Sequence, residues 1–369
     1  MNLSQTKPHY EILDGLRGIA AIMVLGFHVI EAYYVTDIET GKYNQLLNHA
    51  YLAVDFFFVL SGFVIGYAYD DRWGKMSIGN FLKRRIFRLH PMVIFGTVLG
   101  IIMFYFGAGE VFPLIKDIPL WRVLLYAVLG LLMIPTPPSI DIRGWQEMYT
   151  LDAPTWTLAF EYFANLLYAL VIRRFSKTAL SVLVFVAACA TIHLTLTHGD
   201  VIGGWTVDTN HLHIGFTRLM FPFFAGLLLY RLGKVIHIRQ SFLWCSLLLI
   251  AVLIVPRVGG PESDWMNGVY EAAVIIVVFP LIVAMGAGGK VKKKSASRLY
   301  KLLGDMSYPV YLVNYPLCYV HTAWVAKTKC TLAEGAWVAV GVFVAILLIS
   351  YAAMRFYDIP VRKWLRKKM

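Results

Sequence analysis

The sequence predicts an all-α polytopic membrane protein with about ten transmembrane helices and one re-entrant or interfacial segment. Hydrophobic residues make up 59% of the 369 residues and charged residues only 15%, whereas a soluble domain is about 45–50% apolar and about 25% charged. Apolar stretches near the ~20 residues that span a bilayer recur along the whole chain. Basic residues gather in alternate connections between these stretches. All three observations indicate a protein that crosses the bilayer many times.

The predicted apolar segments are eleven in number, and each is long enough to form a helix in the membrane or at its surface. In chain order they are 16–35, 50–69, 86–106, 119–135, 155–172, 179–197, 214–230, 241–256, 269–288, 307–326 and 334–354.

The ends of several segments carry signals of their own. The first segment contains Arg17 and His28 and lacks a small-residue cleavage site, so we expect a retained helix and not a secretory signal. The segment 155–172 begins beside Pro154 and Trp156, which favours entry from the external side. The second and third segments are joined by a basic connection that includes "KRRIFR".

Charge sets the expected orientation. Lys and Arg cluster in "KRRIFR", "RRFSK", "KVKKK" and the tail "RKWLRKK", while the connection 136–152 carries little positive charge. The positive-inside rule therefore places both termini in the cytoplasm, which requires an even number of crossings. One of the segments 86–106 and 119–135 is then re-entrant or interfacial, and the shorter 119–135 is the better candidate. We expect ten crossings in a single domain over 1–369, with no fused extracytoplasmic domain.

The same charge pattern argues against other classes of site. The net charge of +12 follows the membrane topology, so no nucleic-acid partner is expected, and the run 292–294 is interpreted as a solvated cytoplasmic loop. The four cysteines show no CxxC spacing, and the external-loop histidines fit no zinc spacing, so no metal site is predicted. These residues are Cys189, Cys245, Cys318, Cys330, His193, His198, His211 and His213.

Ionisable side chains inside the apolar segments are the main functional candidates, because each costs about 2.5–3.5 kcal/mol at mid-bilayer even on a permissive scale. They are Arg17, His28, Asp55, Glu161, Arg218, Glu271 and Arg355.

Arg17 and His28 are eleven residues apart on the first predicted helix. At ~1.5 Å per residue this places them about 16 Å apart and, after about three turns, on one face. That face would carry a cation near the cytoplasm and an imidazole deep in the membrane. The alternative is that His28 only makes a hydrogen bond between helices.

Glu161 and Asp55 are the two carboxylates that stand out. Glu161 is expected about two turns below the external surface, where a buried carboxylate needs a partner, and His28 is a candidate. Asp55 precedes Ser61 and Gly62, which offer a hydroxyl and a place for close helix approach. Together with His28 they would form a set suited to proton transfer. Their alternative role is to tie helices together.

Arg85 and Arg88 lie three residues apart at the predicted cytoplasmic start of a helix and share one face. Paired guanidiniums suit bidentate phosphate contacts, so this pair is a candidate site for a phosphorylated ligand. Stop-transfer charge and lipid headgroup binding remain alternatives.

Five motifs together resemble the acyltransferase-3 superfamily of bacterial integral-membrane acyltransferases. They are "LDGLRGIAAIMVLGFH", "VDFFFVLSGFVIG", "RRIFRLHP", "PTWTLAFEYFANLLY" and "LGDMSYPVYLVNYPL", and they cover nearly the whole chain in order. Two positions depart from the family pattern: Asn314 stands where a His is common, and Asp358-Ile359-Pro360 replaces Glu-x-Pro. An Asn cannot titrate near neutral pH, so a proton relay at that position is in doubt.

The resemblance implies transfer of an acyl group, expected to be acetyl, from cytoplasmic acyl-coenzyme A to a hydroxyl of a cell-surface or exported glycan. It implies a multi-pass protein of the bacterial inner membrane, with acetyl-coenzyme A as donor substrate and no permanently bound cofactor. Many relatives carry a fused extracytoplasmic domain. Without one, we expect direct transfer or a separate extracytoplasmic transferase.

The mechanism implied for this chain assigns three kinds of role. Arg85, Arg88 and Arg17 would bind the coenzyme A phosphates, and His28 would be the general base, oriented by Glu161 or Asp55. Donors for the transition-state oxyanion would come from Ser61, Ser307, Tyr308 or Asn314.

Two alternatives stay open. A covalent acyl-histidine could replace direct attack. A secondary transporter or lipid flippase would also use buried charges and Gly- or Pro-interrupted helices.

Overall fold

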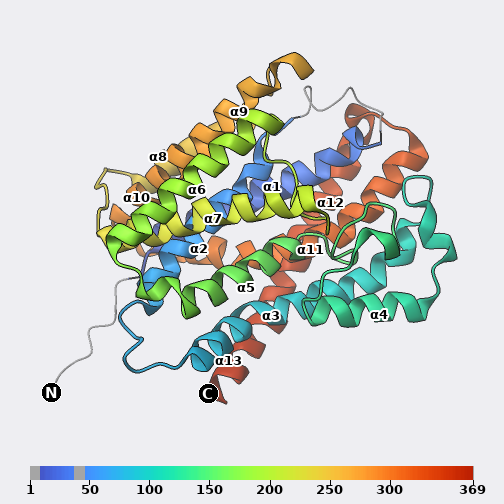
Figure 1. Ribbon diagram of the computed structural model, residues 1–369. Coiled ribbons are helices and arrows are strands. Elements are labelled where there is room, and N and C mark those ends of the chain that lie inside the picture. Colours follow the sequence, from blue (N-terminus) through green and yellow to red (C-terminus); the bar gives the residue numbers. More distant parts are fainter. Residues whose placement is uncertain (1–8, 37–45, 369) are drawn as a thin grey trace.

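The computed structural model describes residues 9–36 and 46–368, which form α-helices joined by short 3₁₀ and π segments and contain no strand. The helices are α1 (Glu11–Tyr34), α2 (Ala53–Tyr69), α3 (Ile78–Met103), α4 (Leu120–Leu131), α5 (Thr155–Leu170), α6 (Lys177–His198), α7 (Thr209–Leu232), α8 (Ser241–Ile254), α9 (Asp264–Ala273), α10 (Phe279–Gly288), α11 (Lys294–Thr328), α12 (Leu332–Ala352) and α13 (Ile359–Lys367). Figure 1 shows them as one bundle.

All eleven predicted apolar segments contain helix, which confirms the all-α polytopic class. In the described ranges, seven helical stretches are long and apolar enough to cross a membrane. The count of ten crossings and the cytoplasmic location of both termini stay predictions. The 12 residues of α4 would extend only about 18 Å, less than the ~30 Å hydrocarbon core.

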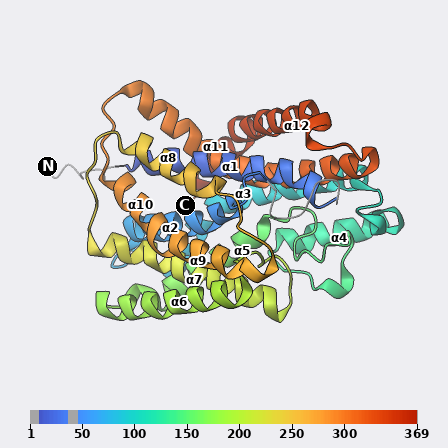
Figure 2. The same cartoon turned by 90° about the horizontal axis from the view of Figure 1, so that it is seen from above.

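The helices α1 and α11 pack along much of their length and lie side by side in both views (Figures 1 and 2). Their contact is close at Gly18, where a Cβ atom would lie 2.6 Å from the carbonyl oxygen of Leu303. Leu16 and Leu312 are both fully buried. This packing brings the first half of α1 against the first half of α11.

A second close pair is α2 with α7. A Cβ on Gly62 would lie 1.8 Å from the carbonyl oxygen of Phe223, and one on Gly226 would lie 2.0 Å from that of Val59. Small residues facing each other let two helices approach closely in a membrane protein. The sequence predicts a close approach of helices at Ser61-Gly62, and the contact of Gly62 with α7 confirms it.

The segment between α4 and α5 enters the bundle instead of staying on its surface. Leu151 and Asp152 are buried, and they fill the space beside two glycines of α3, Gly100 and Gly96. Arg143 is 1% exposed.

At the other end of the chain, a π segment (Ala353–Asp358) joins α12 to α13, and α13 packs against α3 (Figure 1). The C-terminal basic residues are thereby placed beside the basic start of α3.

Candidate active site

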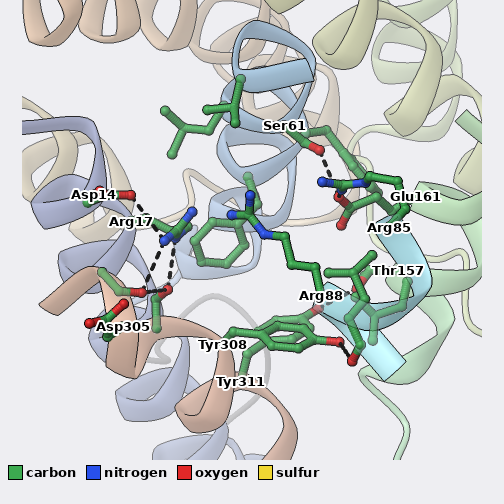
Figure 3. Close-up of a pocket in the computed structure, with 18 of the residues that line it drawn as sticks. Asp14, Arg17, Ser61, Arg85, Arg88, Thr157, Glu161, Asp305, Tyr308 and Tyr311 are labelled. Carbon is green, nitrogen blue, oxygen red and sulfur yellow. Dashed lines mark hydrogen bonds and ion pairs between the residues drawn. The ribbon is translucent and has the colours of Figure 1, made fainter. Parts of the chain in front are cut away.

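A cavity of about 320 Å³ lies among α1, α2, α3, α5, α11 and α13. Seven of the ten predicted site residues line it, whereas His28, Asp55 and Asn314 do not. Figure 3 labels ten of the lining residues: Asp14, Arg17, Ser61, Arg85, Arg88, Thr157, Glu161, Asp305, Tyr308 and Tyr311.

Glu161 is held on one side of the cavity by Arg85 and Ser61. Nη2 of Arg85 donates to Oε1 of Glu161 at 2.5 Å, and the Ser61 hydroxyl donates to the same oxygen at 2.8 Å. Arg85 is only 3% exposed, so the carboxylate offsets the cost of burying its charge. The partner of Glu161 is therefore Arg85, where the sequence suggested His28.

Arg17 forms the opposite side. Its Nε donates to Oγ of Ser307 at 2.9 Å, and its Nη2 donates to the carbonyl oxygen of Gly304 at 3.1 Å. Nη2 also lies 3.1 Å from a carboxylate oxygen of Asp14. These contacts tie α1 to α11 and fix the guanidinium at the cavity wall.

Arg88 projects into the space between these two groups, above Tyr308 and Tyr311 (Figure 3). Among residues 9–36 and 46–368 it makes no hydrogen bond and no ion pair. A guanidinium that lines a cavity without a carboxylate of its own is suited to bind an anionic ligand there.

His28 lies beyond the inner end of the cavity. Its Nδ1 is 3.0 Å from Oε2 of Glu31, and its ring meets the edge of Tyr315 with centroids 4.8 Å apart. Tyr311, one turn earlier on α11, lines the cavity and shares a hydrogen bond of 3.0 Å with Thr157. About one helical turn, ~5.4 Å, therefore separates the cavity from His28.

Asp55 belongs to a different cluster. Its carboxylate is fully buried and accepts from Nη2 and Nε of Arg218 at 2.7 and 3.3 Å. Arg218 also donates to the carbonyl oxygen of Tyr51 at 2.9 Å. In the described part of the chain, Asp55, His28 and Glu161 have three different partners and do not form one group.

The four predicted oxyanion donors all donate to groups of the protein. Ser61 donates to Glu161 at 2.8 Å, Ser307 to the carbonyl of Gly304 at 2.7 Å, Tyr308 to the carbonyl of Leu89 at 2.7 Å, and the Asn314 amide to the carbonyls of Val310 and Tyr311 at 2.9 Å. Any oxyanion contact therefore needs one of these bonds to be exchanged.

Three relevant residues were missed by the sequence reasoning. Glu31 follows His28 by three residues, a spacing that puts both on one helix face and could have identified it. Arg362 and Arg366 line the cavity, although the sequence shows them only as part of a basic tail, and nothing local in the sequence shows that α13 folds back onto α3.

A further buried cluster lies in the segment between α4 and α5. Arg143 lies over the ring of Tyr319, 3.5 Å from its centroid, and the Tyr319 hydroxyl donates to Glu147. Burial raises the pKa of Glu147 to about 8, although Arg143 and the Tyr319 hydrogen bond act in the opposite direction. In the described ranges, no group of three His, Cys, Asp or Glu side chains is placed to hold a metal ion.

Comparison with known proteins gives relatives over part or most of the chain. Protein 2 in the picA locus of Rhizobium radiobacter is 34% identical over 45% of this chain and 85% of its own length. Peptidoglycan O-acetyltransferase OatA of Listeria monocytogenes is 20% identical over 97% of this chain, and O-acetyltransferase OatA of Staphylococcus aureus is 22% identical over 95%. The chain spans 56–57% of the length of these OatA proteins. No solved structure is significantly similar.

The family comparison agrees with the resemblance seen in the five motifs. The model of the family described as "Acyltransferase domain" matches residues 10–355, which is nearly the whole chain. The relatives named O-acetyltransferase match along almost the same length. The predicted enzyme class, an acyltransferase, is thereby confirmed, and the chain belongs to the acyltransferase-3 family.

Proposed function

We propose that this protein is a membrane O-acyltransferase that binds acyl-coenzyme A, with acetyl as the acyl group, in the arginine-lined cavity. The acyl group then passes to a hydroxyl of a glycan on the external side of a bacterial inner membrane. The acceptor class follows the relative named peptidoglycan O-acetyltransferase. A separate extracytoplasmic transferase would be needed only if direct transfer fails.

The observation that carries the proposal is the unpaired Arg88 between Arg17 and Arg85. Its two neighbours already have carboxylate partners, Asp14 and Glu161. A ligand with several negative charges would give Arg88 the anion it lacks and could share the outer donors of the other two. The pyrophosphate of coenzyme A has this chemistry.

The reactive end of the donor must travel further than the phosphates. With the phosphates at the arginines, the pantetheine arm would run along α11 towards Tyr311, and the thioester would have to pass the Tyr311–Thr157 contact to reach His28. A rotation of Tyr311 would break one hydrogen bond, which costs about 1 kcal/mol.

At His28 the proposed reaction is direct acyl transfer. The imidazole takes the proton of the acceptor hydroxyl, the oxygen attacks the thioester carbonyl carbon, and the C–S bond breaks. The coenzyme A thiolate leaves and takes the proton back from the imidazolium. Glu31 keeps the imidazole oriented and stabilises its protonated form. A trapped acyl-histidine would contradict the direct route.

Binding and turnover of radiolabelled acetyl-coenzyme A by the detergent-purified chain test the proposal. Arg88→Ala should weaken donor binding about 10- to 100-fold, as expected for the loss of charge-assisted hydrogen bonds. Arg84→Ala is the matched control, because Arg84 is exposed and does not line the cavity; its affinity should stay within about twofold. His28→Ala should bind the donor normally and release no coenzyme A.

Two results would contradict the proposal. If the wild-type protein binds no acetyl-coenzyme A, the cavity has another ligand, and a transporter or flippase becomes the better explanation. If His28→Ala turns the donor over at the wild-type rate, the base is another residue.

A further inference from the structure

The C-terminal helix contributes two arginines to the cavity. Arg362 and Arg366 lie four residues apart on α13, hence on one face, and both line the cavity. Nη2 of Arg362 is 2.5 Å from Oδ2 of Asp358, a carboxylate that also lines the cavity. The ion pair with Asp358 therefore holds the Arg362 guanidinium in place, and Arg366 lies one turn further on.

The arginines that line the cavity differ in exposure. The side chain of Arg85 is 4% exposed, those of Arg362 and Arg17 are 21% and 26% exposed, and Arg366 is exposed to solvent. In the described ranges Arg366 makes no hydrogen bond and no ion pair. The mouth of the cavity thus has a guanidinium available for an anion, separate from the unpaired Arg88 inside.

The phosphate groups of the donor lie at two separate points of the molecule, and they can therefore reach both Arg88 inside the cavity and Arg366 at its mouth. Coenzyme A carries a pyrophosphate next to the pantetheine arm and a 3′-phosphate on the ribose at the opposite end from the thioester. The thioester must point inwards, towards Tyr311, so the ribose end remains at the mouth. The pyrophosphate then lies near Arg88, and the 3′-phosphate lies near α13.

We propose that Arg362 and Arg366 form the subsite for the ribose 3′-phosphate of the donor, so that the enzyme selects 3′-phosphorylated acyl-coenzyme A. This inference rests on the proposed function. A phosphomonoester offers three oxygens and about two negative charges, which two guanidiniums from one helix face can share.

A lipid headgroup is the other source of phosphate near this helix. The exposed side chains of α13 include Lys363, Trp364 and Lys367. These residues are suited to contact the membrane surface, because tryptophan favours the interface and lysine favours anionic lipids. Arg362 and Arg366 face the cavity instead, which favours the donor as their ligand.

The test compares coenzyme A with 3′-dephospho-coenzyme A, each titrated into the full chain in phosphatidylcholine nanodiscs. The wild type should bind coenzyme A about tenfold more tightly, which corresponds to about 1.4 kcal/mol. Arg366→Ala should remove this preference and leave the affinity for the dephosphorylated compound unchanged. Lys367→Ala is the matched control and should keep the preference.

A second variant guards against misfolding. Arg362→Lys keeps a cation beside Asp358 but loses the bidentate contact with the 3′-phosphate. It should therefore reduce the preference for coenzyme A, while the variant still elutes as a monodisperse protein. Equal affinity of the wild type for both compounds would overturn the inference. An equal loss of affinity for both compounds in Arg366→Ala would overturn it as well.

The remaining outcomes separate the two proposals and the two phosphate sources. If the wild type binds neither compound, the proposed function itself fails, and this inference fails with it. If Arg366→Ala keeps the preference but loses a response to added phosphatidylglycerol, the arginine serves lipid headgroups and the inference is wrong.

Discussion

At the residue scale, His28 and Glu31 show how a helix can supply a base and its orienting carboxylate from one face. Their spacing of three residues brings Nδ1 and Oε2 within 3.0 Å without help from another helix. The other two candidate carboxylates are occupied elsewhere, Glu161 by Arg85 and Asp55 by Arg218. Glu31 is therefore the carboxylate that we expect to act on His28.

Replacing Glu31 by Gln tests this positioning role. The amide can still accept the hydrogen bond from Nδ1 but brings no charge to stabilise the imidazolium, so kcat should fall about tenfold or more. The Kd for acetyl-coenzyme A should not change, because Glu31 does not line the cavity. Turnover and equilibrium binding of the same preparation give both values.

The conservative variant separates charge from packing. Glu31→Asp keeps the carboxylate and should recover part of the lost kcat. A kcat for Glu31→Gln equal to that of the wild type would remove Glu31 from the mechanism, and a parallel loss of donor affinity would indicate a structural role only.

At the element scale, the segment between α4 and α5 does more than connect two helices. It places Leu151 and Asp152 against the glycines of α3 and brings Glu147 to the Tyr319 hydroxyl, which donates a hydrogen bond to it. Since Tyr319 and Tyr315 are in edge contact on α11, and Tyr315 contacts His28, this segment packs against the elements that hold the imidazole.

The raised pKa of Glu147 predicts how the docking of this segment depends on pH. With a folded-state pKa of about 8 and an unfolded value of about 4.3, the folded protein holds a proton that the unfolded chain releases. This contribution to stability is therefore lost as pH rises between these two values, by about 1.4 kcal/mol per pH unit.

Glu147→Gln should remove this contribution to the pH dependence of the free energy of unfolding. It keeps an acceptor for the Tyr319 hydroxyl and does not titrate, so its free energy of unfolding should fall less steeply from pH 5 to pH 8 than that of the wild type. Thermal unfolding in detergent across this range measures both slopes. Parallel curves for the two proteins would show that Glu147 is ionised in the folded state.

At the scale of the whole molecule, features that arise from neighbouring residues could be predicted from the sequence, and features that arise from contacts between distant helices could not. Each apolar segment depends only on its own residues, and all eleven are helical. The motif residues Arg17, Arg85 and Glu161 do meet at one cavity. The Arg17–Asp14 pair is local, with a spacing of three residues that the sequence shows, whereas the Arg85–Glu161 pair could not be read from sequence because it joins helices far apart in the chain. The return of α13 to the cavity is likewise a tertiary contact with no local pattern.

Orientation in the membrane is the remaining whole-molecule prediction, and it rests on the alternation of basic loops. If the positive-inside pattern holds, Ser139 faces outside and Ser295 faces the cytoplasm; both side chains are exposed. Single cysteines can be introduced at these two positions in a variant that lacks the four native cysteines. The two cysteines should then differ in their accessibility to labelling in intact cells. A membrane-impermeant maleimide should label Ser139→Cys at once and Ser295→Cys only after the cells are opened. The reverse pattern would put the arginine-lined cavity on the external side, away from cytoplasmic coenzyme A, and would exclude the proposed donor.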